Sequence, residues 1–246
     1  MLLEARAVTK AFGSFKAVDS ASVAVNEGEI LGLIGPNGAG KSTFFNCLTG
    51  DLAPTSGAVM LQGEDVTSRS PEARAELGLA RTFQLPQTFG GMSVVENVMI
   101  GAFLRTADAA EARRHALGVL ERVGMGAFAQ TPARNLGTPG RKRLEIARAL
   151  ATQPKVLLLD EAMAGLNPAE IRRAIDLVRD IHRSGVTLVI VEHIMEVINS
   201  LAERVIAFHQ GKEIARGTPP EVTGDPAVIE AYLGKRAARA AARDAR

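Results

Sequence analysis

The chain has 246 residues, 46% of them apolar, which is enough for one large domain or for a core with a smaller subdomain. Cys47 is the single cysteine, so an internal disulfide is excluded and a reducing compartment fits best. The first residues do not resemble a signal peptide, and no apolar run reaches the roughly 20 residues that cross a bilayer. A net charge of +2 is weak evidence for nucleic acid, and we expect no such partner.

Positive charge is concentrated at the C-terminus. Residues 235–246 form an Ala/Arg-rich tail with five basic residues and one acid, while the rest of the chain is close to neutral. We interpret this tail as a segment outside the folded domain. It is either a solvated helix or a weak contact for anionic lipid.

The strand patterns come in two kinds. Residues 1–28 and 57–66 alternate apolar and polar side chains, which predicts short antiparallel strands. Three short apolar runs, at 30–35, 155–161 and 187–193, are typical of strands buried on both faces of a parallel sheet. Each run is followed by a loop and a helical pattern, as in βαβ units. We therefore predict an α/β fold with a parallel-sheet core and an antiparallel β layer.

The middle of the chain differs from the rest. Residues 93–150 carry helical patterns and no convincing strand. We predict one domain over 1–234, with an inserted helical subdomain at about 86–151. Its core would then comprise about 1–85 and 152–234.

Two helix starts are marked in the sequence. Asn167 can cap a helix that begins at Pro168 and runs to about Ser184. The turn at residues 137–140 precedes a basic helix that we expect to begin at Arg141. A helix start exposes backbone N–H groups and the positive end of the helix dipole, so it favours an anion.

The stretch GPNGAGKS at residues 35–42 matches the pattern G-x-x-x-x-G-K-[S/T] between a predicted strand and a predicted helix, the context that this pattern requires. Glycines let successive N–H groups close around phosphate oxygens, and the helix dipole points at them. We expect Lys41 to bridge the β- and γ-phosphates of a nucleotide and Ser42 to ligate Mg²⁺. The nucleotide-binding residues predicted in this segment are Gly35, Pro36, Asn37, Gly38, Ala39, Gly40, Lys41, Ser42 and Thr43.

Two acids, Asp160 and Glu161, end the next buried run. Ligands of open α/β sheets lie beyond the carboxyl ends of the strands, so we expect both acids near the nucleotide. Asp160 fits the Mg²⁺ shell, and Glu161 fits a general base that polarises an attacking water. The alternative is a pair of acids that serve as turn or cap residues.

Three further residues are candidates for the same site. His193 ends the third apolar run and could contact the γ-phosphate or orient the acid and the water. Gln84 follows another predicted strand end, and its amide oxygen could join the Mg²⁺ shell when the helical subdomain swings inward. Phe12 either stacks on an adenine or packs within a hairpin.

In this order, the motifs resemble those of ABC transporter ATP-binding subunits over about residues 2–234. The resemblance implies a P-loop NTPase fold with ATP and Mg²⁺ as cofactors, ATP hydrolysis, and two subunits packed head to tail. It also implies transmembrane permease subunits, indirectly a substrate-binding protein, and a peripheral position on the cytoplasmic face of the inner membrane. AGLNP at 164–168 matches the loop that communicates between the two sites. Apolar residues within 85–92 would dock a permease helix.

A narrower resemblance, to branched-chain amino acid import ATPases, is carried by STFFNCLTG, RTFQ, RLEIARAL, VEHIMEV and VIEAYLG. It implies an importer of branched-chain amino acids or a related small polar substrate, although other subunits choose the substrate. Two features depart from the pattern: the helical subdomain is short, and Ala162 stands where proline usually follows the acids. The alternative is an ATPase for lipid or lipopolysaccharide export, which shares the YLG-type ending.

The turn at 136–140 occupies the position of the family signature, whose usual form is L-S-G-G-Q. Gly137 stands in place of the serine, Pro139 of a glycine and Gly140 of the glutamine, while Thr138 could restore a hydroxyl if the turn shifts its register. In the family, each signature closes on the ATP that the other subunit holds. Because a hydroxyl and an N–H are lost, we expect a heterodimer with unequal sites.

Other classes with the same ATPase head fit less well. DNA-repair and chromosome-structure ATPases need a long coiled coil between the P-loop and the signature, and residues 44–135 are too short for one. Translation-factor relatives carry two ATPase cores, whereas this sequence has one. A regulatory protein that binds nucleotide without hydrolysis would not need Glu161.

Overall fold

The computed structural model describes residues 1–233, so the predicted tail at 235–246 lies outside the described residues. These residues divide into two compact units, each treated by itself below. Unit 1 contains residues 1–70 and those from 188 onward, and unit 2 contains residues 71–187. Within the described part of the chain, no helix is both long and apolar enough to span a membrane.

Unit 1 contains a four-stranded antiparallel sheet in the order β2-β1-β4-β5. Its strands are β1 (Leu3–Phe12), β2 (Phe15–Val25), β4 (Ser56–Leu61) and β5 (Glu64–Asp65). The predicted antiparallel layer is confirmed, but β1 and β2 are long rather than short. Bulges interrupt the β1–β2 register, and Ala7 there has φ +47°, which hides the strand's length from a strict alternation pattern.

Unit 1 also contains parallel strands. These elements are β3 (Ile30–Ile34), β8 (Thr187–Val191), β9 (Arg204–His209) and β10 (Lys212–Gly217), with the helices α1 (Lys41–Thr49), α7 (Met195–Leu201) and α8 (Pro219–Thr223). β3 pairs in parallel with both β8 and β9, and β10 closes a hairpin with β9. Every residue of β3 and β8 is buried, which explains their continuous apolar sequence.

Helix α1 packs its apolar side into the core of unit 1. The rings of Phe44 on α1 and Phe208 on β9 lie 5.2 Å apart between centroids. Cys47, one turn further along α1, is completely buried. The helix ends at Gly50, whose left-handed conformation suits a residue without a Cβ atom.

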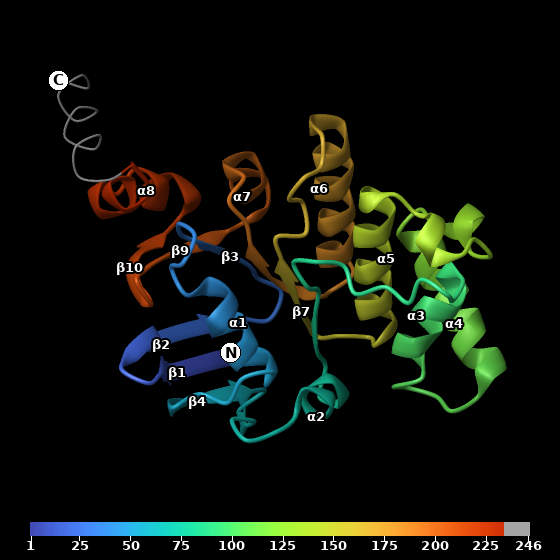
Figure 1. The fold of residues 1–246 in the computed structure, drawn as a ribbon, viewed down its shortest axis with the longest axis horizontal. Helices are drawn as coiled ribbons and strands as arrows, with labels where there is room; N and C mark the ends of the chain where they lie inside the picture. The colour runs from blue at the N-terminus through green and yellow to red at the C-terminus, as the bar shows by residue number, and fades with distance from the viewer. Residues whose placement is uncertain (234–246) are drawn as a thin grey trace. The chain divides into compact units, whose positions relative to one another are not determined.

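Unit 2 combines a parallel strand pair with several helices (Figure 1). Its elements are α2 (Pro71–Glu76), β6 (Leu79–Arg81), α3 (Val94–Ala102), α4 (Ala109–Arg122), α5 (Thr138–Ala151), β7 (Val156–Asp160) and α6 (Pro168–Arg183), with 3₁₀ turns at Gly126–Phe128 and Ala133–Asn135. Helices α3, α4 and α5 pack against one another, and they lie where the sequence carries helical patterns, at residues 93–150. The predicted helix from Pro168 is confirmed as α6, with the capping box of Asn167 and Glu170 and a buried stripe of isoleucine and valine.

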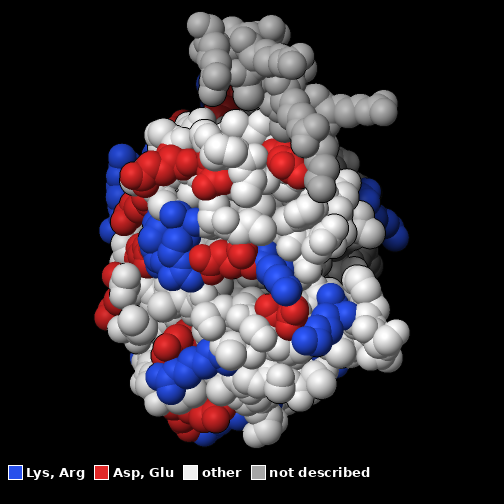
Figure 2. Space-filling model, turned by 90° about the vertical axis from the view of Figure 1, so that its left-hand side faces the viewer, with Lys and Arg blue, Asp and Glu red and all other residues white. Residues whose placement is uncertain are grey.

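Figure 2 shows one face of the molecule, where basic and acidic side chains lie next to one another. Ion pairs of unit 1 have the same character: Arg6 pairs with Glu4, Arg216 with Glu213, and both Lys16 and Lys212 with Asp19. Such exposed pairs add little stability. They do neutralise charge locally. On the face in Figure 2, basic and acidic side chains are interspersed, so charge of one sign is not gathered there.

Candidate functional site

The loop between β3 and α1 has glycines where other backbone segments come close. Gly35 has φ +149° and Gly40 has φ +98°, both in the region that favours glycine. A Cβ atom on Gly35 would lie 2.3 Å from the carbonyl oxygen of Phe208, and one on Gly40 would lie 2.2 Å from that of Ala17. These two glycines therefore allow the loop to pass tightly against its neighbouring strands.

The start of α1 is suited to an anion. Gly40 caps the helix without a side-chain hydrogen bond, and the first turn contains no acid. Lys41 is buried, and its Nζ atom donates to the carbonyl oxygens of Gly35 at 2.6 Å and Pro36 at 3.2 Å. The ammonium group thus lies inside the curve of the loop, while Ser42 after it is exposed.

The two other predicted residues of unit 1 are accessible. Phe12 ends β1 and is 51% exposed, with the Nζ atom of Lys10 5.3 Å from its ring centroid. His193 follows the end of β8 by two residues and is exposed. With Ile34 and Tyr232, among others, His193 lines a cavity of about 280 Å³, so it lies near the point where the glycine-rich loop begins.

Sequence reasoning missed the contact between Tyr232 and the loop. The N–H of Gly35 donates to the phenol oxygen of Tyr232 at 2.7 Å. Burial raises the pKa of the Tyr232 phenol, which therefore keeps its proton at neutral pH. The only signal in the sequence was the ending VIEAYLG, which indicates family resemblance but not this contact.

In unit 2, Asp160 ends β7 and is 3% exposed. Its Oδ2 atom lies 3.3 Å from Nη2 of Arg81, at the end of β6, and this ion pair offsets part of the cost of burying both charges. The N–H of Asp160 donates to Oγ1 of Thr82 at 3.2 Å. Arg81 was not among the predicted residues, because an arginine in LART has no distinguishing pattern.

Glu161 is held in an uncommon backbone conformation. Its φ is +48°, which is rare for a residue other than glycine and typical of functional positions. The Nε2 atom of Gln84 donates to Oε2 of Glu161 at 2.7 Å, so two predicted residues are in contact. Lys142 on α5, which the sequence did not single out, donates from Nζ to the carbonyl oxygens of Glu161 at 2.9 Å and Ala164 at 2.7 Å.

The predicted helix start at Arg141 is wrong by one turn, since α5 begins at Thr138. Gly137 is the cap residue, with φ −68° and ψ 172° and no side-chain cap. Pro139 fits the first helical turn because an N–H there has no partner within the helix. The Arg141 N–H donates to the Gly137 carbonyl at 3.0 Å, which closes the first turn. The turn residues are therefore part of the helix start itself.

The residues of unit 1 fit the phosphates of a nucleotide, and the oxygen-bearing residues of both units can be compared with what Mg²⁺ requires. Unit 1 supplies the glycine-lined loop, the uncapped start of α1 and the Lys41 cation. The oxygen groups of Ser42, Gln84 and Asp160 are of the kind that Mg²⁺ prefers. Residues 1–233 contain no group of three or more His, Cys, Asp or Glu side chains that could hold a metal ion by themselves. That is compatible with Mg²⁺, which takes several of its ligands from phosphate and water.

Family models match two parts of the chain. The model described as ABC transporter matches residues 18–164, which is more than half of the chain. A second model, described as branched-chain amino acid ATP-binding cassette transporter, matches residues 212–238. Together they include the glycine-rich loop, the two acids and Tyr232.

Curated relatives extend the similarity over nearly the whole chain. The chain is 38% identical over 250 residues to the high-affinity branched-chain amino acid transport ATP-binding protein LivG of Salmonella typhimurium. This match covers 95% of the chain and 98% of LivG. It is 37% identical over 254 residues to BraF of Pseudomonas aeruginosa, with the same coverage. The lipopolysaccharide export system ATP-binding protein LptB of Acidithiobacillus ferridurans is 35% identical over 233 residues, with 95% and 97% coverage.

A solved structure agrees with these relatives. A nucleotide-free ATP-binding cassette from an ABC transporter matches with a TM-score of 0.87 and 31% identity, over 95% of this chain and 99% of that one. The fold, the order of the motifs and the curated relatives lead to one family. The chain belongs to the ABC transporter ATP-binding cassettes, the ATPase subunits of transporters.

Proposed function

We propose that this ATPase subunit powers the import of branched-chain amino acids or of a related small polar substrate. The observation that carries the proposal is the 38% identity to LivG over 95% of the chain. The match of residues 212–238 to the branched-chain amino acid transporter model supports it. Lipopolysaccharide export is the second candidate, because LptB is 35% identical.

In this proposal, the loop of unit 1 binds the triphosphate of ATP. The exposed N–H groups at the start of α1 surround the phosphate oxygens, and Phe12 stacks on the adenine. Lys41 exchanges its hydrogen bonds to the Gly35 and Pro36 carbonyls for the β- and γ-phosphates. Because its ammonium already lies within the loop, this exchange needs only a small movement.

Glu161 acts as the general base. It accepts a proton from a water whose oxygen attacks the γ-phosphorus, while the bond from that phosphorus to the β–γ bridging oxygen breaks and ADP leaves. His193 donates a hydrogen bond to the γ-phosphate. Ser42, Gln84 and Asp160 would hold Mg²⁺, which would supply positive charge against the phosphates. The left-handed backbone of Glu161 supports its assignment as base.

Permease subunits act through the segment that follows Gln84. Leu85 and Phe89 are exposed apolar side chains in this segment, so they offer a docking surface for a permease helix. Gln84 itself contacts Glu161, so a shift of the segment would be felt at the general base. The complex would hold this subunit peripherally at the cytoplasmic face of the inner membrane.

A second ATPase subunit completes the arrangement, with each signature facing the ATP that the other subunit holds. We propose a heterodimer, because the turn Gly137–Gly140 lacks the signature serine and one N–H. The stronger site would combine this chain's loop with the partner's signature. The start of α5 still offers its dipole to the partner's ATP.

The experiment is ATP turnover by the complex purified with its permease subunits. Glu161→Gln should retain ATP binding and lose at least about 100-fold in turnover, because an amide cannot accept the proton. The partner ATPase must carry the equivalent substitution, so that its own site does not mask the loss. Glu27→Gln, at an exposed loop acid, is the control and should leave turnover unchanged. Normal turnover in the doubly substituted complex would refute the role of Glu161.

The substrate is tested separately, in proteoliposomes that contain the complex and its substrate-binding protein. ATP-dependent uptake of labelled leucine or isoleucine is expected. Uptake of neither, with stimulation of ATP turnover by lipopolysaccharide, would favour the second candidate.

A further inference from the structure

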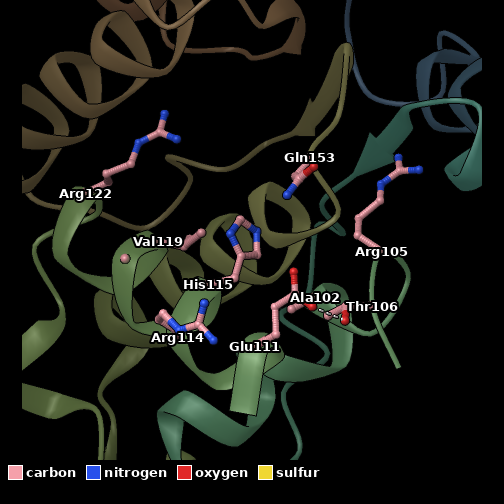
Figure 3. Close-up of a pocket in the computed structure, with 10 residues that line it drawn as sticks. Ala102, Arg105, Thr106, Glu111, Arg114, His115, Val119, Arg122 and Gln153 are labelled. Atoms are coloured by element: carbon pink, nitrogen blue, oxygen red, sulfur yellow. Dashed lines mark hydrogen bonds between the residues drawn. The ribbon is translucent and has the colours of Figure 1, made fainter. Parts of the chain in front are cut away.

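A large pocket lies wholly within unit 2, and none of the residues assigned above lines it. Its volume is about 620 Å³, which is in the range of small-molecule sites. One face of α4 forms much of it, with Arg114, His115 and Arg122 among the lining residues (Figure 3). Arg105, after the end of α3, and Gln153, after the end of α5, complete this set.

The pocket gathers positive charge that is not neutralised. Within residues 1–233, Arg105, Arg114 and Arg122 form no ion pair with a carboxylate. Arg105 donates to three backbone carbonyls and Arg122 donates to the hydroxyl of Ser184, so both are held in place by neutral acceptors. Glu111 is the one acid among the lining residues. The lining therefore carries more positive than negative charge, an arrangement that costs some stability unless an anion is bound.

Gly118 carries a second local cost. It lies in the interior of α4, where glycine is less favourable than alanine by about 1 kcal/mol. Neither backbone conformation nor crowding requires it, because a Cβ atom added there would have no neighbour within 4 Å. The absence of a side chain at Gly118 instead leaves room in the wall of the pocket.

The backbone of Gln153 carries a third local cost in stability. It follows the C-terminal end of α5 with φ +53°, a position where glycine is usual because the left-handed conformation strains other residues. Its amide lines the pocket. His115 shares the wall and donates from Nε2 to the carbonyl of Ala151 at 3.1 Å, because a carbonyl oxygen can only accept.

One pocket is lined by three arginines without a carboxylate partner, by Gly118, which packing does not require, and by Gln153, whose backbone is strained. Local choices that oppose stability are expected at functional sites. We propose that this pocket binds an anion carrying two or more phosphate groups. Guanidinium groups bind phosphate through paired hydrogen bonds. Arg114 and Arg122 lie eight residues apart on α4, about 12 Å along the helix, so an anion with two phosphate groups could engage both without either side chain bending toward the other.

Such phosphates have two sources, a soluble polyphosphate compound or a phospholipid with two phosphates in its headgroup. Inorganic tripolyphosphate and vesicles of cardiolipin in phosphatidylcholine represent them. Because the glycine-rich loop also binds phosphate, both probes are titrated against the full chain carrying Lys41→Ala. We expect saturable binding of one probe, and which probe binds identifies the source.

The matched pair of variants is Arg114→Ala and Arg113→Ala, added to that chain. Both remove one charge from the same turn of α4, but Arg113 lies off the face that lines the pocket. We expect Arg114→Ala to weaken binding at least tenfold and Arg113→Ala to change it less than twofold. Gln153→Gly should weaken binding while the melting temperature stays the same or rises, which separates ligand contact from folding. Gly118→Glu should weaken it as well, and Gly118→Ala is its control.

Two results would overturn the proposal. The first is equal weakening by Arg113→Ala and Arg114→Ala, which would indicate diffuse charge attraction. The second is no saturable binding of either probe. If in that case Arg114→Ala, but not Arg113→Ala, prevents assembly with the permease, the occupant is an acidic protein segment and the phosphate site is refuted.

Discussion

The backbone N–H of Gly35 donates to the phenol oxygen of Tyr232 at 2.7 Å, across 197 residues of sequence. Gly35 is the first residue of the nucleotide-binding loop, and Tyr232 is almost the last residue that the structure describes. The end of the cassette therefore supports the start of the loop. This support uses an N–H group, so the phenol acts as the acceptor.

Tyr232→Phe removes the acceptor and keeps the ring. A hydrogen bond of this kind contributes about 1 kcal/mol, so the free energy of unfolding should fall by about that amount. ATP binding should weaken by roughly two- to tenfold, because the first residue of the loop is less well held. Chemical denaturation and nucleotide titration measure the two effects. Unchanged values for both would show that water replaces the phenol at no cost.

Lys41→Ala should abolish tight ATP binding. The loop loses its cation at the β- and γ-phosphates, which is worth about 3 kcal/mol, or a loss of more than 100-fold in affinity. Lys16→Ala is the control, because Lys16 is an exposed lysine of the same unit that pairs with Asp19. Isothermal titration with ATP and Mg²⁺ measures both variants. Equal affinities for Lys41→Ala and the parent chain would refute the loop assignment.

Phe89→Asp should uncouple transport from ATP binding. The ring is 49% exposed, and the backbone of Phe89 is held by hydrogen bonds with Asn97 that any side chain allows. Arg148, now 5.4 Å from the ring, would face the new carboxylate, so the fold should survive. Phe103→Asp, at a ring that is 45% exposed outside the 85–92 segment, is the control. Transport retained by Phe89→Asp, or lost equally in both, would place the docking surface elsewhere.

Glu145 makes stability depend on pH. Burial on α5 raises the pKa of its carboxyl above the ordinary 4.5. The folded state then binds the proton more tightly than the unfolded state does. The stability from this group is complete below pH 4.5 and is lost as pH rises through the raised pKa.

Glu145→Gln removes this titration and keeps an acceptor for the Gln87 N–H. The free energy of unfolding of the parent minus that of Glu145→Gln should therefore decrease with rising pH and level off above the raised pKa. Denaturation between about pH 4 and pH 8 measures the difference. Glu121→Gln, at an exposed acid on α4, should show no comparable trend. A difference that grows with pH would contradict the assignment.

The signature turn can be tested with a matched pair, Gly137→Ser and Gly137→Ala. Both fit, because the φ of Gly137 is −68° and an added Cβ atom would meet only Pro139, at 3.9 Å. Serine also caps α5, worth about 0.5–2 kcal/mol. In the complex, Gly137→Ser with Pro139→Gly should raise ATP turnover at the site where the partner holds ATP, and Gly137→Ala with Pro139→Gly should not. Efficient turnover by this chain alone as a homodimer would show that the turn works as it is.

Local signals in the sequence predicted the elements well. The apolar run of β3 and the cap of α6 are each contained in a short stretch of sequence, and both elements were found where expected. The start of α5 was misplaced because Pro139 and Gly140 indicate a turn, although proline also suits a first helical turn. Contacts such as Arg81 with Asp160, 79 residues apart, could not be predicted, since residue types alone do not give distances.

Cys47 sits on α1, the helix that begins at Lys41, and its thiol is completely enclosed although it is the only thiol among 246 residues. A thiol-specific reagent can then react only when that helix opens. The rate at which this thiol is modified therefore reports how often α1 opens, and it can be measured in the chain without any substitution. Nucleotide bound at the start of α1 should lower this modification rate, because it stabilises the closed helix. Occupancy of the loop can then be followed through the sulfur of Cys47, an atom that does not contact the ligand.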